Sequence, residues 1–479
     1  MIQVQLFKIG NFNLKIKHLV IIGILFLSFS ISLMLRSQVL DYGYELNEFD
    51  PFFNYRATQY IVDNGIDAYF EWNDSLSWYP NGRDVSATSQ VFLHLTAAST
   101  YWIFGGGSDL YDFTILFPVI FSSLSVIVIF ALVRVIGGTS AGLFSALLFS
   151  ISIPLLIRSP LGWFKSEPLG LFLGLLTVYL FLSGINSYNK KIAFIKLAAA
   201  GIFTAFSISS WGGNHFFIIP IGIFFFALPF LRNDHKFIIW AIPLFTISVL
   251  LSSFGFERIA SNFILGLGGL SLIASTLFLV SCILIQTKSS NNKSRNALLF
   301  LISILIIVSG FLVLNSESAF LLDGSHRYLN ALNPFLTSVD PLVDSVAEHA
   351  TPDTGIIFLL HSILMIFSGL GIWIILSHKS SESQVLLKND MKAFVIIFGI
   401  TGAYVSSTFI RLELFASLSL IILAAISLSI LTKNLFKIDP TTKKSIILKI
   451  SFVGLILTLF VTPLVYPDLN WISAIDSPP

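Results

Sequence analysis

Three carboxylates stand in polar segments between apolar runs, where a membrane protein has little need of charge. Asp50 lies in EFDPFFNYRAT, Glu167 in RSPLGWFKSEPLG and Glu348 in DSVAEHATP. Hard divalent cations take oxygen ligands, and Mg²⁺ often uses only a few carboxylates together with the phosphate of a substrate. If the three side chains meet, they indicate a site for Mg²⁺ or Mn²⁺ beside a phosphate-bearing lipid.

Asp50 and Glu348 differ in their sequence surroundings. Pro51 biases the backbone of Asp50 toward an extended conformation, so that the carboxylate projects from a turn near Arg56, a candidate partner. An ordinary turn or helix-cap aspartate fits the same pattern. Glu348 lies beside His349 in a long polar segment. His349 is a candidate metal ligand, although both residues are equally typical of an ordinary loop.

Basic residues accompany these carboxylates. Arg158, Lys165 and Glu167 share a segment rich in proline and glycine. This segment is either a functional loop or a solvated loop with a Lys165–Glu167 pair. Arg411 lies between two apolar runs, and a cation so close to the hydrocarbon boundary is a functional candidate. It is suited to hold a lipid phosphate in a forked geometry. Pairing with Glu413, or extension of its side chain toward water, is the other interpretation.

Composition places these residues in a polytopic membrane protein. Of 479 residues, 55% are hydrophobic and only 11% are charged, against about 25% charged residues in soluble domains. The single cysteine allows no intrachain disulfide and no cysteine-based metal site. No HExxH, P-loop or GxSxG motif occurs, which disfavours hydrolases and nucleotide-driven pumps. The net charge of +2 gives no indication of nucleic-acid binding.

Apolar runs predict thirteen membrane spans, each long enough to form a helix that satisfies its own backbone in lipid. They cover residues 19–36, 113–134, 139–157, 168–184, 192–209, 214–231, 236–252, 262–286, 297–314, 355–377, 392–409, 412–431 and 446–463.

Charge sets the expected orientation. With the N-terminus in the cytoplasm, the cytoplasmic loops contain most of the 28 basic residues and only four of the 26 acidic ones, Asp234, Glu382, Asp390 and Asp439. This distribution satisfies the positive-inside rule at every loop. It holds only if residues 90–104 do not span, so we expect them to form a helix at the outer surface.

Two long regions, 37–112 and 315–354, and the short loop 158–167 then face outward. The domain prediction is a single transmembrane domain over residues 1–479 that ends just outside the last span. The chain is thus expected to be a multi-pass protein with its C-terminus and its candidate site outside the cytoplasm.

Six motifs carry a resemblance that covers essentially the whole chain. EFDPFFNYRAT, WYPNGRD, RSPLGWFKSE, SSWGG, SVAEH and FIRLEL, in this order, resemble the catalytic subunit of oligosaccharyltransferase, the archaeal type above all. The resemblance implies an all-α GT-C glycosyltransferase fold with about thirteen spans, in the cell membrane of an archaeon or the endoplasmic reticulum of a eukaryote. It also implies N-glycosylation by an inverting, metal-dependent transfer of an oligosaccharide from a dolichyl or similar polyprenyl (pyro)phosphate to Asn in Asn-x-Ser/Thr. The expected partners are the lipid-linked oligosaccharide, an acceptor polypeptide, the bilayer and further subunits, but no nucleic acid.

Carried over by position, the resemblance makes Asp50 and Glu348 the residues that bind both the metal and the acceptor amide. It makes Glu167 a further metal ligand and Arg411 the residue that holds the lipid phosphate. Supporting roles fall to Arg56, Arg158, Lys165, His349 and Trp211, the last within SSWGG.

The chain departs from the family pattern at two points. Lys165 stands where the family has a metal-ligating aspartate, and a protonated lysine is no metal ligand. The chain contains no WWDYG motif and is expected to lack the soluble C-terminal domain that recognises the acceptor. Acceptor recognition then comes from elsewhere, such as a separate domain, or the chain is truncated. Two alternatives therefore stay open: another GT-C transferase that glycosylates Ser/Thr or a lipid, and a non-catalytic paralogue or scaffold subunit.

Overall fold

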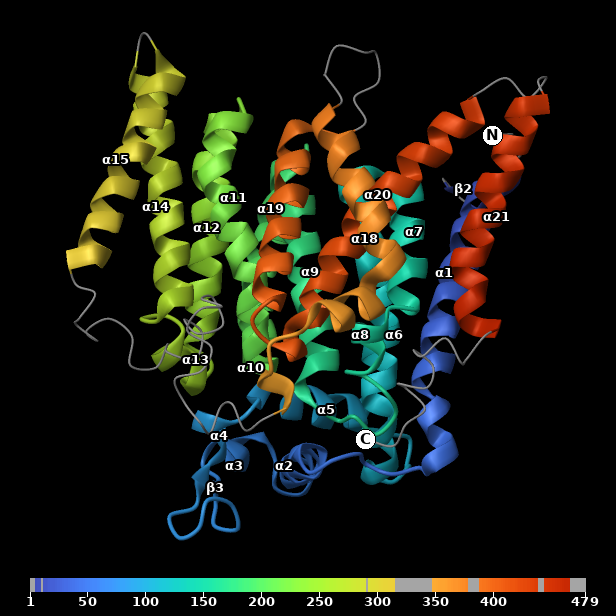
Figure 1. Cartoon of the computed structure of the whole chain (residues 1–479). Helices are drawn as coiled ribbons and strands as arrows, with labels where there is room; N and C mark the ends of the chain where they lie inside the picture. Colours follow the sequence, from blue (N-terminus) through green and yellow to red (C-terminus); the bar gives the residue numbers. More distant parts are fainter. Residues whose placement is uncertain are drawn as a thin grey trace.

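Long helices form a bundle across the whole molecule (Figure 1). The computed structural model describes residues 5–9, 12–289, 292–314, 347–377, 387–437 and 443–465. The long helices are α1 (Ile16–Arg36), α6 (Leu110–Gly137), α7 (Thr139–Ser150), α9 (Ser166–Ile185), α10 (Lys190–Ser210), α11 (His215–Leu231), α12 (His235–Ser253), α14 (Leu267–Lys288), α15 (Lys293–Leu314), α18 (Thr354–Ser377), α19 (Asn389–Ser406), α20 (Glu413–Lys437) and α21 (Lys443–Val465).

A helix occupies each of the thirteen predicted segments. Eight helices in the described part are long and apolar enough to cross a membrane, so the chain is an integral membrane protein, while thirteen crossings stay a prediction. The segment 139–157 is not one helix: α7 ends at Ser150, and the short α8 (Ile153–Leu156) follows. Pro154 explains the break, because it lacks the N–H that a continuous helix would donate to the Ser150 carbonyl, whereas it is tolerated in the first turn of α8.

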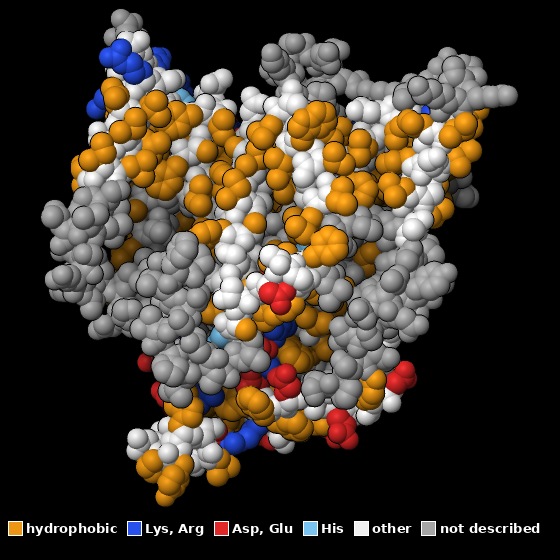
Figure 2. Space-filling model, viewed as in Figure 1, with side chains coloured by type: hydrophobic (Ala, Val, Ile, Leu, Met, Phe, Trp, Pro, Cys, Tyr) orange, Lys and Arg blue, Asp and Glu red, His pale blue; other side chains and the backbone are white. Residues whose placement is uncertain are grey.

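Apolar side chains cover the outside of the bundle as well as its core (Figure 2). Phe26 on α1, Ile306 on α15 and Trp373 on α18 are each about two-thirds exposed, as expected of side chains that face lipid. By contrast α20 is buried along most of its length and packs against α7, α18 and α19. The interior helix α20 thus forms a fixed support for the residues at its start.

Short elements gather at one end of the bundle, the lower end in Figure 1. They comprise η1 (Gln38–Tyr42), α2 (Asp50–Asn64), α3 (Ile66–Phe70), α4 (Val85–Thr88), α5 (Val91–Phe104), α13 (Glu257–Asn262) and the antiparallel pair β3 (Asn73–Asp74) and β4 (Arg83–Asp84). The 14 residues of α5 extend about 21 Å, less than the roughly 30 Å of a bilayer core. The placement of residues 90–104 at the outer surface stays a prediction.

An antiparallel pair, β1 (Gln5–Ile9) and β2 (Phe12–Lys15), precedes α1 at the opposite end. The two strand pairs are small additions to a helical fold that was expected to be all-α. Figure 2 shows acidic side chains gathered toward the lower end, with several basic ones among them, and a basic group at the upper end, over α14 and α15. The direction of the charge distribution across the membrane stays a prediction. Of the second long outer region, residues 315–346 lie outside the described part.

Candidate active site

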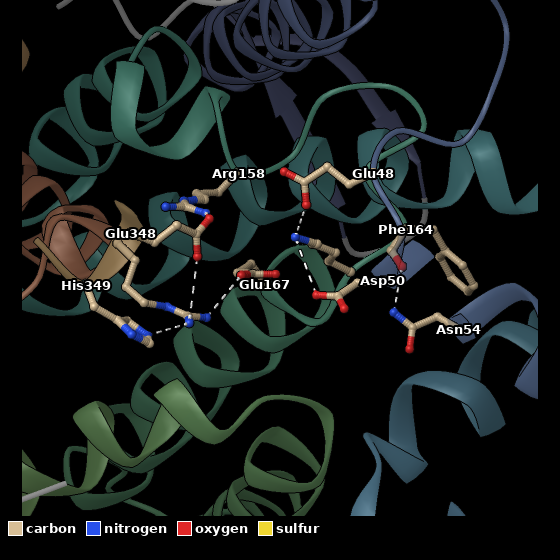
Figure 3. A network of polar contacts seen from close by, with 10 residues as sticks. Glu48, Asp50, Asn54, Arg158, Phe164, Glu167, Glu348 and His349 are labelled. Atoms are coloured by element: carbon tan, nitrogen blue, oxygen red, sulfur yellow. Dashed lines mark hydrogen bonds and ion pairs between the residues drawn. The ribbon is translucent and has the colours of Figure 1, made fainter. Parts of the chain in front are cut away.

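The first outer region is fastened to the short loop 158–167 by backbone and amide hydrogen bonds. The Asn47 N–H donates to the Gly162 carbonyl (3.1 Å), and its side-chain amide donates to the Leu161 carbonyl (2.6 Å). One turn into α2, the Asn54 amide donates to the Phe164 carbonyl (2.8 Å; Figure 3). These bonds hold Asp50 and Lys165, far apart in sequence, on facing segments.

Arg36, at the end of α1, fastens the same short loop from the other side. Its buried guanidinium donates through Nε to the Ser159 hydroxyl (2.8 Å), and its carbonyl accepts the Leu161 N–H (2.9 Å). The sequence offered only one signal for this role, a basic residue at the end of an apolar run. The loop is thus fixed along most of its length.

Gly162 lies where the two segments come closest. Its φ is +78°, in the left-handed region, and a Cβ on this residue would overlap the carbonyl oxygen of Glu45. We expect Gly162→Ala to destabilise the protein by about 1–3 kcal/mol, because both the backbone conformation and the close contact oppose a side chain. Thermal unfolding in detergent measures the effect. Gly23→Ala is the matched control, because a Cβ at Gly23 meets nothing within 4 Å; equal unfolding temperatures for the two variants would contradict the prediction.

Asp50 is the first residue of α2, with Pro51 in the first helical turn. The expectation of a turn with extended backbone is therefore wrong: proline is tolerated in a first turn, where its missing N–H breaks no helical hydrogen bond. The expected Asp50–Arg56 pair is also wrong. Arg56 forms an ion pair with the buried Asp74 and lies 5.8 Å from the Trp72 ring centre, and it therefore supports the β3–β4 turn.

Lys165 joins two carboxylates of the first outer region. It forms an ion pair with Glu48, and its Nζ lies 3.5 Å from Oδ2 of Asp50 (Figure 3). Lys165 and Glu167 are both buried, so the interpretation as a solvated loop with a Lys165–Glu167 pair is wrong. Glu48 was not identified from the sequence. Its one signal was its position two residues before Asp50 in EFDP.

Glu348 lies in the 3₁₀ turn η4 (Ala347–His349) and faces two guanidinium groups. It forms an ion pair with the buried Arg158, and its Oε2 lies 3.7 Å from Nη1 of Arg411. Burial alone raises the pKa of Glu348, but Arg158, Arg411 and Lys165 outweigh this effect and hold the pKa below 4.5. Glu348 is therefore an ionised carboxylate at neutral pH.

Arg411 lies in the turn η5 (Ile410–Leu412) and is shared between acidic residues. Its guanidinium is 3.7 Å from Glu167 and 3.7 Å from Glu348, and its Nη1 is 3.5 Å from Nε2 of His349. It does not pair with Glu413, as one interpretation of the sequence had it. Glu413 instead binds a histidine inside the bundle, so Arg411 faces the outer residues.

That histidine is His361 on α18. Its Nε2 lies 2.7 Å from the Glu413 carboxylate, its Nδ1 lies 3.3 Å from the Ser417 hydroxyl, and all three side chains are buried. The start of α20 is thereby fastened to α18. In addition, the Ile410 N–H donates to the Ala350 carbonyl (2.9 Å), which ties η5 to η4. The segments that carry Arg411 and Glu348 therefore have fixed relative positions.

Most of the predicted site residues border one cavity of about 780 Å³. Its charged lining includes the predicted site residues Asp50, Lys165, Glu167, Glu348, His349 and Arg411. Trp211, also predicted, lines it at the end of α10 and stacks on Phe415 at 5.5 Å. Beyond the charged part, α11 adds apolar lining such as Ile219, Ile223 and Phe226, and α14 adds the small residues Gly268, Ser271 and Ser275. A cavity with one ionic and one apolar part suits an amphiphile with a charged head group.

The three predicted metal ligands each face a protein cation: Asp50 faces Lys165, Glu167 faces Arg411, and Glu348 faces both arginines. Among the residues that the structure describes, no group of three or more His, Cys, Asp or Glu side chains is placed to hold a metal ion. The arrangement thus does not fit a three-carboxylate ion site, and binding of Mg²⁺ or Mn²⁺ stays an untested prediction.

The chain is similar to known proteins in both sequence and fold. Residues 16–462 match the family model described as oligosaccharyl transferase STT3, N-terminal. The chain is 26% identical over 459 residues to subunit STT3B of the dolichyl-diphosphooligosaccharide–protein glycosyltransferase of Arabidopsis thaliana, which covers 93% of the chain and 60% of that relative. It is 27% identical to subunit STT3 of Dictyostelium discoideum, over 88% of the chain and 58% of that relative.

The fold also matches a solved structure, that of the archaeal oligosaccharyltransferase AglB from Archaeoglobus fulgidus in complex with an inhibitory peptide and a dolichol-phosphate. The TM-score is 0.72 at 17% identity, and the match covers 96% of this chain and 56% of the other. The chain thus spans about 60% or less of the length of these proteins.

Proposed function

We propose, since this chain belongs to the STT3 family of oligosaccharyl transferases, that it takes part in the transfer of an oligosaccharide from a polyprenyl (dolichyl) phosphate or pyrophosphate to protein. The acceptor is the Asn side chain of Asn-x-Ser/Thr, on the extracytoplasmic face. One observation carries the proposal: Asp50, Glu348 and Arg411 border the same cavity, although they come from three distant parts of the sequence.

The acceptor amide requires activation, because its nitrogen lone pair is delocalised into the carbonyl group. Asp50 and Glu348 are carboxylates that accept the two N–H bonds of the amide and hold it with reduced conjugation. The nitrogen then attacks the anomeric carbon of the first sugar. The new N–C bond forms as the bond from that carbon to the phosphate oxygen breaks, which inverts the configuration at the carbon. One amide proton passes to a carboxylate.

Arg411 is suited to the departing phosphate. The electron pair of the broken bond leaves on the phosphate oxygen, and a guanidinium placed there stabilises the charge that develops. The side chain of Arg411 is about one-quarter exposed and borders the cavity, so a ligand reaches it. The apolar lining from α11 suits the isoprenoid chain of the carrier. In support, the AglB structure of similar fold contains an inhibitory peptide and a dolichol-phosphate.

The proposal is tested with the purified full chain, a lipid-linked oligosaccharide and a peptide that contains Asn-x-Thr. The expected product is a glycopeptide with the sugar on Asn, identified by mass spectrometry. The matched Gln-x-Thr peptide stays unmodified. A product with the sugar on Ser, Thr or a lipid would contradict this proposal and would indicate another kind of GT-C transferase. If no product forms and the lipid-linked oligosaccharide does not bind, a non-catalytic role replaces it.

The pH dependence of transfer reports on Glu348. Its pKa is held below 4.5, so the carboxylate is populated at higher pH and is lost as the pH falls through the lowered pKa. Removal of a neighbouring cation raises this pKa, and we therefore expect Arg158→Met to move the acid limb of kcat/KM to higher pH. Profiles between about pH 4 and pH 8 measure the shift. Lys196→Met, at the opposite end of α10 from Trp211, is the control; coincident acid limbs in all three proteins would contradict the prediction.

A further inference from the structure

The ammonium group of Lys165 lies between two carboxylates, those of Glu48 and Asp50. Glu48 forms an ion pair with it, and Oδ2 of Asp50 lies 3.5 Å from its Nζ; Figure 3 shows the two acidic side chains close together. Only 9% of Lys165 is exposed, and its Nζ lies 4.3 Å from the centre of the Trp163 ring. A lysine on the surface of a protein is mobile, whereas this one is held by two anions and an aromatic face.

The backbone around Lys165 is equally fixed. Lys165 caps the N-terminus of α9, and its N–H donates to the Trp163 carbonyl (2.7 Å). The loop that precedes it is the one fastened by Arg36, Asn47 and Asn54. The position of the positive charge is therefore set by the fold before any ligand enters the cavity.

Other cations balance the remaining carboxylates of the site. Four carboxylates face three protein cations across the ion pairs Lys165–Glu48, Lys165–Asp50, Arg411–Glu167, Arg411–Glu348 and Arg158–Glu348. A divalent ion added here would meet little uncompensated negative charge, and it would be repelled by the nearby ammonium.

We propose that Lys165 replaces a divalent metal ion in this chain: its ammonium group fixes the Asp50 carboxylate for the acceptor amide, and the site works without Mg²⁺ or Mn²⁺. This inference rests on the proposed transfer for its catalytic part, but its statement about metal binding stands by itself. An ammonium donates three hydrogen bonds and carries a compact charge, so it can hold two carboxylates in place. Lys165 is a positioning residue in this scheme, because it acts through Asp50.

Replacement of Lys165 by aspartate reverses the arrangement. The new carboxylate lies two residues before Glu167, whose Oε2 is buried without a hydrogen-bond partner among the described residues. Removal of the ammonium and addition of a carboxylate create an oxygen-rich site with Asp50 close by. Lys165→Asp is therefore expected to bind a divalent ion, whereas Lys165→Met loses the positive charge and gains no ligand.

Mn²⁺ binding to the purified full chain is the primary test, measured by the electron paramagnetic resonance signal of free Mn²⁺. We expect Lys165→Asp to bind Mn²⁺ at least about tenfold more tightly than the unmodified protein, and to unfold at a higher temperature when Mn²⁺ is present. Lys196→Asp makes the same charge change at the other end of the bundle and controls for net charge. Tight Mn²⁺ binding by the unmodified protein that is lost in Asp50→Asn would overturn the proposal.

Transfer assays form the second arm. Transfer by the unmodified chain is expected to persist in EDTA and to fall at least about tenfold in Lys165→Met without recovery in Mn²⁺, because the orientation of Asp50 is lost. If EDTA abolishes transfer and Mn²⁺ restores it, the inference is overturned while the proposed function stands. If the chain transfers nothing under any condition, the proposed function fails, and the Mn²⁺ comparison still decides the role of Lys165.

Discussion

Replacing Glu348 with glutamine will lower the rate of transfer by about 10²–10³-fold, the range observed when one preorganised electrostatic contact is removed from an active site. Glutamine keeps the shape of the side chain but removes the negative charge of the carboxylate, which is proposed to bind the N–H of the acceptor amide. It also leaves Arg158 and Arg411 close together without the anion that compensates them. We therefore expect a loss in kcat together with a modest loss of stability, measured by glycopeptide formation and thermal unfolding.

Asp353 provides a matched control for Glu348. It lies five residues further along, is exposed, and accepts the Ile356 N–H at the start of α18 (2.8 Å). Asp353→Asn removes the same charge at the same end of the bundle without entering the cavity. Transfer at a tenth or more of the normal rate in Glu348→Gln would show that this carboxylate does not hold the acceptor.

Replacing Asp50 with asparagine is expected to have an effect of similar size, about 10²–10³-fold on kcat. The variant retains the Lys165–Glu48 ion pair, so the loop stays in place and the loss reports on the carboxylate itself. Asp63 lies on the same helix and is exposed, which makes Asp63→Asn the control. Glycopeptide formation at saturating acceptor separates a loss in kcat from a loss in binding. A variant of Asp50 that changes only KM would assign Asp50 to binding rather than to activation of the amide.

The sequence predicts the helices of this protein well, because lipid leaves apolar segments few other conformations. It fails where a single residue acts against the pattern, as Pro154 does in the first turn of α8. Hydropathy does not record such a break. The placement of residues 90–104 at the outer surface stays a prediction, which rests on the charges of every later loop.

The partners of charged residues were less predictable. Arg56 pairs with Asp74 and Lys165 with Glu48, although the sequence offers nearer candidates in Asp50 and Glu167. Neighbours along the chain point in different directions once the backbone is folded, and which ions meet depends on contacts between distant loops. The resemblance to a known family identified several of the residues that line the cavity, but it assigned no role to Arg83 and Arg258, which also line it, or to Glu48 beside it.

The sharing of Arg411 between Glu167 and Glu348 has a consequence for the sequence of binding events. An anion that binds Arg411 competes with both carboxylates, and it thereby weakens the hold of the guanidinium on Glu348. In the proposed reaction, occupancy by the phosphorylated carrier and readiness for the polypeptide would then be thermodynamically linked, and each ligand would alter the affinity of the other by the same factor. A carrier that had already given up its glycan would still present its phosphate to Arg411, so departure of the spent carrier would reset the site for the next cycle.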